Sequence, residues 1–198
     1  PDSMIYKEQL IEEFEYDLSL KPHNIAIHGR IEGSNKLNGI RYTYTLSDSG
    51  REDLYCSDLK LTYNILPLGS EGQQDKAYLK MIPNPRKAFE KNEPLFAYYE
   101  IYNLAFDLGG NTHYTLDFTL IMVEERGGLL KRLGKIFRGK RQYRIATASE
   151  QRGSRRHESQ FMNFDVSKAM PGSYQLQLKV IDHIMRKQTI TTAEFELL

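Results

Sequence analysis

The stretch that most constrains the fold spans residues 94–104, Pro-Leu-Phe-Ala-Tyr-Tyr-Glu-Ile-Tyr-Asn-Leu, because it is apolar on both of its faces. A short apolar run also fits a buried helix, but the aromatic enrichment, Pro94 before it and Gly109-Gly110 after it favour a strand. We therefore expect a central β-strand with neighbours on both edges. With the two-residue period of a strand, its side chains divide into two opposite sets: Leu95, Ala97, Tyr99 and Ile101, and Phe96, Tyr98, Tyr102 and Leu104.

Alternation of apolar and polar residues continues on both sides of this stretch. It is clearest over residues 59–65, 114–122, 174–180 and 191–197, and turn residues separate these segments. Weaker strand patterns cover residues 11–20, 24–32 and 40–46, whereas residues 1–16 fit the spacing of a helix equally well. The sequence predicts an all-β fold, an antiparallel immunoglobulin-like β-sandwich with extra N-terminal strands.

Two regions are expected along the chain. Residues 1–56 form lead-in strands that pack on the sandwich or end a preceding domain, and residues 57–198 form the sandwich. Met170-Pro171-Gly172-Ser173 before Tyr174 suits the turn that enters a sandwich strand, in the manner of a tyrosine corner. The predicted core consists of Tyr63, Phe96, Tyr98, Ile101, Tyr102, Phe118, Leu120, Tyr174, Leu176, Leu178 and Phe195.

A basic insertion interrupts the sandwich pattern at residues 126–156. Eleven lysines and arginines against one acid, Glu150, give these residues a net charge of +10, although the chain as a whole carries +1. Within residues 127–139 the apolar residues recur at helical spacing, which predicts a short amphipathic helix. The candidate surface-binding residues are Lys131, Arg132, Lys135, Arg138, Lys140 and Arg141.

Four roles fit this insertion. Its apolar face folds back on the sandwich while its charges stay in water, which is the favoured interpretation, or it adsorbs to an anionic membrane surface. Alternatively it docks on an acidic protein, or it contacts nucleic acid phosphates without reading bases, because few aromatic residues accompany the charges.

Catalytic motifs are lacking. The five histidines are scattered, and neither a His-Glu-x-x-His pair nor a Gly-x-Ser-x-Gly elbow nor a glycine-rich phosphate loop occurs. Cys56 is the only cysteine, which excludes an internal disulfide and a multi-thiolate zinc site. We expect Cys56 to be a small residue packed in a strand. Asp182-His183 lies at a strand end, where it could line a pocket. We predict no catalytic, cofactor-binding or metal-binding residues and no enzyme activity.

Glu100 is the acid that most needs explanation, because it lies among aromatic residues on the central strand. A carboxylate there requires a hydrogen-bond or ion-pair partner, or its pKa rises. In the structural interpretation, the Glu100 carboxylate has such a partner and only supports the fold. The functional interpretation is a groove for a sugar or a peptide, formed by Tyr98, Glu100, Tyr102 and Asn103.

Several segments together resemble one protein family. They are Ser57-Asp58-Leu59, Pro83-Asn84-Pro85, the run of residues 95–104 and the segment from Pro171-Gly172-Ser173-Tyr174 to Asp182. The chain resembles, over residues 57–198, the C-terminal β-sandwich region of bacterial GWxTD-motif proteins, although the motif itself is absent because the chain has no Trp. The resemblance implies a bacterial, exported or periplasmic protein without known active-site residues.

The function expected from these observations is a non-catalytic interaction or structural module of a larger exported bacterial protein, with a protein partner or an upstream domain as its contact. No run of about 18 apolar residues is present, and the first residues do not have the pattern of a signal peptide, so we expect a fragment or a processed product. The alternatives are a binder of anionic surfaces or acidic partners through the insertion, and a hydrolase with an unrecognised site.

Overall fold

The computed structural model of the chain describes residues 2–6, 9–13, 21–30, 37–44, 52–67, 79–123 and 144–198. The chain divides into two compact units, Pro1–Arg51 and Glu52–Leu198, and each is described by itself. All regular structure in the described residues is β-strand, so the expected all-β class is confirmed. No helix able to cross a membrane is found in the part of the chain that is described.

The first unit contains two antiparallel hairpins. Strand β1 (Asp2–Tyr6) pairs with β2 (Gln9–Glu13), and β3 (His23–Arg30) pairs with β4 (Leu37–Tyr44). Of residues 1–16, the structure describes 2–6 and 9–13, and both segments are strands, so the helical alternative is wrong for them. A cross-strand side-chain bond supports the second hairpin: Thr43 Oγ1 donates to Asn24 Oδ1 at 2.8 Å.

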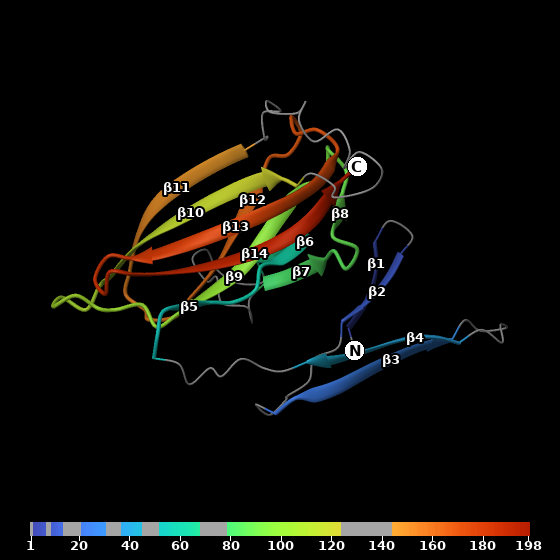
Figure 1. Cartoon of the computed structure of the whole chain (residues 1–198), viewed down its shortest axis with the longest axis horizontal. Helices are drawn as coiled ribbons and strands as arrows, with labels where there is room; N and C mark the ends of the chain where they lie inside the picture. The colour runs from blue at the N-terminus through green and yellow to red at the C-terminus, as the bar shows by residue number, and fades with distance from the viewer. Residues whose placement is uncertain are drawn as a thin grey trace, which may run out of the picture. The chain divides into compact units, whose positions relative to one another are not determined.

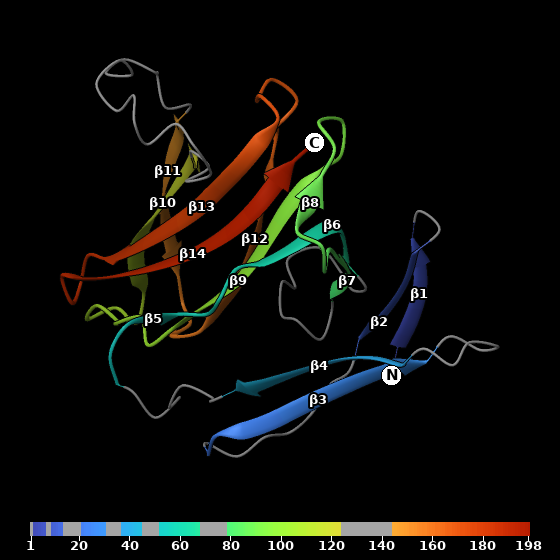
Figure 2. The same ribbon diagram turned by 45° about the vertical axis from the view of Figure 1, so that its right-hand side comes forward.

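The second unit consists of two five-stranded sheets, which form separate layers (Figure 1, Figure 2). The first sheet has the order β11 (Arg144–Gly153), β10 (Thr112–Met122), β13 (Gly172–Asp182), β14 (Lys187–Leu197) and β8 (Ala88–Phe89). The second has the order β12 (Glu158–Phe164), β9 (Leu95–Tyr102), β6 (Lys60–Pro67) and β7 (Leu79–Pro83), and β5 (Tyr55–Cys56) also pairs with β9. All pairs are antiparallel except β8 with β14.

The alternation in the sequence places the core between these two sheets. The ring centroids of Tyr99 and Phe118 lie 5.6 Å apart, and those of Phe118 and Phe164 lie 5.3 Å apart, so aromatic side chains from both sheets meet. Nine of the predicted core residues are buried: Tyr63, Tyr98, Ile101, Phe118, Leu120, Tyr174, Leu176, Leu178 and Phe195. Phe96 and Tyr102 are only partly buried, so their assignment to the core was wrong; alternation along β9 places them on the face away from the first sheet.

Strand β9 is the central strand that the sequence predicts. It pairs with β12 along one edge and with β5 and β6 along the other. Its inward residues Leu95, Ala97 and Ile101 have no exposed surface, and Tyr98 on the opposite face is 4% exposed. The strand is thus covered along its inner face, and on its outer face it is buried at Tyr98.

A β-bulge in β6 changes which face its last residues occupy. The register between β6 and β7 shifts between Thr62 and Asn64, and the Asn64 side chain accepts a hydrogen bond from the backbone N–H of Ile65 at 2.8 Å. The sequence predicts Ile65 on the same face as Tyr63. Instead Ile65 packs in a cluster around Tyr98 on the outer face, with Met81, Phe96 and Phe161. The expected uniform alternation through residue 65 is therefore wrong.

The amphipathic helix predicted over residues 127–139 lies outside the described residues. The described end of the insertion, residues 144–156, forms β11 and the beginning of the connection to β12, with no helix. A helical insertion thus has no support from the described residues.

Two side chains of β13 make hydrogen bonds that anchor the two ends of this strand. The fully buried carboxylate of Asp182 accepts hydrogen bonds from three backbone N–H groups, those of Ala105 and Ile184 at 2.8 Å and of Met185 at 3.0 Å. It thereby joins the segment after β9 to the turn after β13. The Tyr174 hydroxyl donates to the Met170 carbonyl at 2.6 Å, and we call this contact the corner bond.

Replacing Asp182 by Asn is expected to lower the free energy of unfolding by about 2–4 kcal/mol, because charge-assisted bonds are lost and the amide NH2 faces a backbone donor. Asp165→Asn is the matched control: Asp165 also accepts a backbone bond, from Ser167 at 3.0 Å, but at the surface. The control should change stability by less than about 0.5 kcal/mol. Urea denaturation measures both variants, and equal losses would contradict this role for Asp182.

Tyr174→Phe removes the hydroxyl but keeps the ring that stacks on Phe195 at a centroid distance of 5.6 Å. The expected loss is about 1 kcal/mol, the contribution of one hydrogen bond. Tyr174→Leu should cost clearly more, because it also removes the stacked ring. Thermal unfolding of the two variants distinguishes these contributions, and a Tyr174→Phe protein as stable as wild type would show that the corner bond contributes nothing.

Candidate functional site

The outer face of β9 brings together three of the four residues predicted to form a groove. The Glu100 carboxylate accepts a hydrogen bond from the Tyr98 hydroxyl at 2.7 Å and another, on its second oxygen, from the Tyr102 hydroxyl. The three side chains alternate along one strand and so share a face. The partner that Glu100 requires is therefore a pair of phenols.

Neighbouring strands extend this face on both sides. The Tyr102 ring lies 5.9 Å from that of Tyr55 on β5 and 5.2 Å from that of His157, between centroids. In register, Ser159 of β12 pairs with Glu100, and Phe161 pairs with Tyr98. We call this surface the Glu100 face. It consists of exposed His157, buried Tyr98 and the partly buried residues Tyr55, Glu100, Tyr102, Ser159 and Phe161.

Ser57 anchors the backbone of this face. Its N–H donates to the Glu100 carbonyl at 2.8 Å, and its hydroxyl accepts from the Glu100 N–H at 2.9 Å. Because β5 ends at Cys56, these bonds continue the pairing of β9 beyond the short strand. The position of the Glu100 carboxylate is therefore fixed through its main chain and through the two phenols.

Asn103 does not join the other three residues. Its backbone has a φ of 63°, a left-handed conformation that Asn tolerates better than most residues. Its side-chain amide donates to the Asp53 carbonyl at 3.0 Å, so it supports the loop after β9. Sequence reasoning in turn missed Tyr55, His157 and Phe161, which come from segments far from β9 in the sequence. Only their pairing with β9 brings them here.

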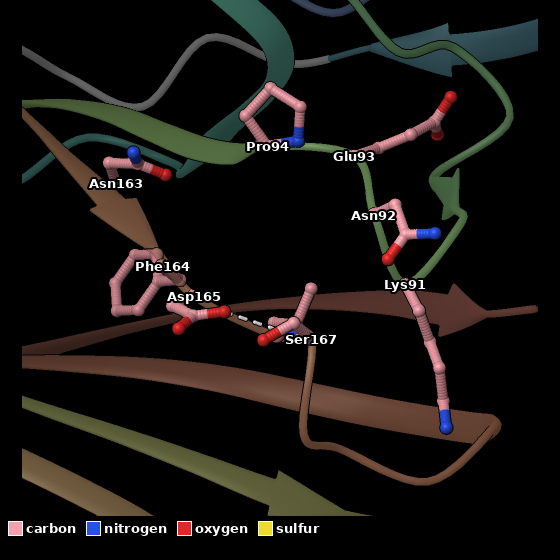
Figure 3. Close-up of a pocket in the computed structure, with 9 residues that line it drawn as sticks. Lys91, Asn92, Glu93, Pro94, Asn163, Phe164, Asp165 and Ser167 are labelled. Atoms are coloured by element: carbon pink, nitrogen blue, oxygen red, sulfur yellow. Dashed lines mark hydrogen bonds between the residues drawn. The ribbon is translucent and has the colours of Figure 1, made fainter.

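A shallow pocket of about 380 Å³ lies at the other end of β9 (Figure 3). It is formed by residues 91–94 before β9 and residues 163–167 at the end of β12. The bond between Asp165 and Ser167 lies at its wall, and the Ser167 side-chain and backbone bonds keep the pKa of the Asp165 carboxyl below its usual range. Carboxylates, amides, Lys91 and the Ser167 hydroxyl line this pocket, and neither a histidine nor a cysteine is among the lining residues.

Two histidines meet on the outer face of the first sheet. The rings of His113 and His183 have centroids 4.5 Å apart, His113 Nε2 contacts Glu150 Oε1 at 2.5 Å, and His183 Nε2 contacts Thr115 Oγ1 at 2.7 Å. No sequence pattern indicated this pair, because His113 lies near the start of β10 and His183 follows β13. Both Nε2 atoms already have protein partners, and among the described residues no group of three or more metal-ligating side chains is arranged to hold a metal.

Neither Asp182 nor Cys56 lines a site. Asp182 is buried, and its carboxylate accepts bonds from three backbone N–H groups. This carboxylate therefore does not line a pocket, whereas the sequence had suggested one for Asp182-His183. Burial, followed by the charges of Asp58 and Glu100, raises the pKa of the Cys56 thiol to about 12. Cys56 therefore stays protonated near neutral pH, as suits a small residue packed in a strand.

The six predicted surface-binding residues of the insertion, Lys131, Arg132, Lys135, Arg138, Lys140 and Arg141, lie outside the described residues. Comparison with known proteins gives no further assignment: no family model matches the chain, and no curated protein matches it. The resemblance to GWxTD-motif proteins stays a prediction.

The contact with His113 should govern the titration of Glu150. The hydrogen bond from His113, then its charge, lowers the pKa of the Glu150 carboxyl. Because the folded-state pKa is depressed, this contact stabilises the fold above the unfolded-state pKa of Glu150, and the stabilisation is lost as the pH falls through the folded-state value. In His113→Ala, a carboxyl-detected NMR titration should show the Glu150 pKa raised towards its usual value.

Asp107 provides the internal control for this titration. Backbone bonds with Asn111 and Gly109 lower the pKa of its carboxyl, and His113 takes no part in them. The Asp107 pKa should therefore be unchanged in His113→Ala. An unchanged Glu150 pKa would contradict the assigned role of His113.

Proposed function

We propose that this chain is a non-catalytic interaction module that binds a protein partner through the Glu100 face. The observation that carries the proposal is a partly exposed carboxylate fixed by two phenol hydroxyls within a band of aromatic side chains. Each hydroxyl donates to one carboxylate oxygen, and a carboxylate has further acceptor sites. Glu100 is thus pre-oriented to accept bonds from a basic side chain of a partner.

The composition of the face favours a protein over a small molecule. Small ligands bind in concave sites, and both described pockets lie elsewhere, one near residues 91–94 and 163–167 and the other near Val123 and Ser173. Aromatic residues are typical of the energetic centre of protein interfaces, where tyrosine and arginine are both enriched. Tyr102, between the rings of Tyr55 and His157, is the expected centre.

We further propose the immunoglobulin-like assignment for the sandwich. Support comes from the sheet order β11-β10-β13-β14, which has the arrangement of strands C′, C, F and G, and from β12-β9-β6, which has that of E, B and A. The bond between Tyr174 and Met170 occurs where the chain passes from β12 to β13, as a tyrosine corner does between strands E and F.

The context proposed for the module is a larger exported bacterial protein, and it rests on the resemblance to GWxTD-motif proteins alone. Binding of anionic surfaces or acidic partners through residues 126–156, and a hydrolase activity, remain separate predictions that no described residue favours.

Binding through the Glu100 face predicts that Tyr102→Ser and Glu100→Gln each weaken retention of the partner by about tenfold or more, since truncation at an interface centre costs about 2 kcal/mol. The immobilised chain would be incubated with a bacterial extract, and proteins retained by wild type but lost in both variants would be quantified by mass spectrometry. Circular dichroism checks that the variants remain folded.

Thr192→Ala is the matched control, because Thr192 is an exposed residue of β14 in the other sheet and should leave retention unchanged. The same proteins are then screened on a glycan array. Retention that is insensitive to both substitutions, or glycan binding that is lost with them, would overturn the proposed protein partner.

A further inference from the structure

Strand β11 forms one edge of the first sheet. Its ten residues pair with β10 in unbroken register, from Thr112 opposite Gly153 to Ile121 opposite Arg144. Within the described residues β11 pairs with no other strand, and Figure 1 shows it as the outermost strand of its sheet. One row of its backbone groups therefore faces away from β10.

Two bonds at the ends of β10 identify that row. Val123 N–H donates to Ser173 O at 2.7 Å, and His183 N–H donates to His113 O at 3.0 Å, so odd-numbered residues of β10 direct their backbone groups to the β13 side. Even-numbered residues of β10 consequently face β11, because the residues of an antiparallel strand alternate between its two neighbours.

The β10–β11 register then decides which residues of β11 face outwards. Residues 112, 114, 116, 118 and 120 are opposite residues 153, 151, 149, 147 and 145, so odd-numbered residues of β11 bond to β10. The N–H and C=O groups directed to the open edge belong to Arg144, Ala146, Ala148, Glu150 and Arg152.

The centre of this edge lacks the usual features that prevent pairing with another strand. It contains no proline, its register shows no bulge, and residues 145–149, Ile-Ala-Thr-Ala-Ser, carry no charge. The side chains of Ala146, Thr147 and Ala148 are exposed and small, so they leave the outward backbone groups accessible. A ten-residue edge of this kind is a template for strand addition.

We infer that the occupant of this edge is a second copy of the chain, whose β11 pairs antiparallel with the first and continues the sheet across a two-fold axis. The strand is self-complementary in the register centred on Thr147. Ala146 of one copy is then opposite Ala148 of the other, and residue 144 is opposite residue 150, which places Arg and Glu, of opposite charge, at paired positions. Every outward backbone group from residue 144 to residue 150 acquires a partner, as an isologous interface requires.

Proline scanning of the edge tests this inference in the full chain. Proline at position 148 removes an N–H that points to the open edge, whereas proline at position 149 removes one that bonds to β10. Sedimentation equilibrium over a wide concentration range should show a reversible dimer for wild type. Ala148→Pro should raise its dissociation constant by about tenfold or more, because each copy loses one bond. Ser149→Pro should lower the melting temperature, and Ala148→Pro should not.

Charge variants test the same register without altering the backbone. Ala148→Lys should weaken the dimer, and Ala146→Glu combined with Ala148→Lys should restore it at low salt, because the two introduced charges then face each other across the axis. Recovery in the double variant supports the register centred on Thr147 even if Ala148→Pro unfolds. A wild-type chain that is monomeric at all concentrations, or a dimer indifferent to the position 148 variants, would overturn the inference.

Discussion

Because β9 is buried along its inner face and at Tyr98 on its outer face, the strand needs a paired neighbour along each edge and packed side chains at these positions. The inward residues Leu95, Ala97 and Ile101 are completely buried, and Tyr98 on the opposite face is nearly so. β12 supplies one neighbour, and β5 and β6 share the other edge. The second sheet is arranged around this requirement, and the first sheet covers the inner face of the strand through aromatic contacts such as that between Tyr99 and Phe118.

The outer face of β9 changes character along the strand. Near its beginning, Phe96 and Tyr98 pack with Ile65 and Met81, which the bulge in β6 turns to this side. Two residues further on, the same face carries Glu100. A carboxylate is tolerable there because the phenols of the neighbouring positions on its own strand satisfy it, so no basic residue has to be brought to the site. The geometry of the Glu100 face thus follows from period-two alternation on a strand whose main chain is anchored by Ser57.

Patterns within single strands could be predicted from the sequence, and relations between strands largely could not. Alternation correctly indicated the inward residues of β13 and β14 and the central position of β9, and the residues before Tyr174 indicated that a strand begins there. It failed at Ile65, because a bulge changes the face of all later residues and has no reliable sequence signal. Tyr98, Glu100 and Tyr102 could be grouped because they share one strand. The rings of Tyr55 and His157, and the contact between His113 and His183, depend on strand pairing, which alternation alone does not specify.

The parallel pairing of β8 with β14 has a consequence for how the protein reaches this structure. It joins Phe89 to Leu197, although β9 to β13 all lie between them in the sequence. The chain entropy lost in closing such a loop is not recovered until the intervening hairpins have formed, so this pairing is a late event in folding. Sandwiches dominated by distant pairings typically fold in milliseconds to seconds. During that interval the C-terminal end of β14 lacks its outer neighbour, and the two residues of β8 pair with it last, at Glu196 and Leu197.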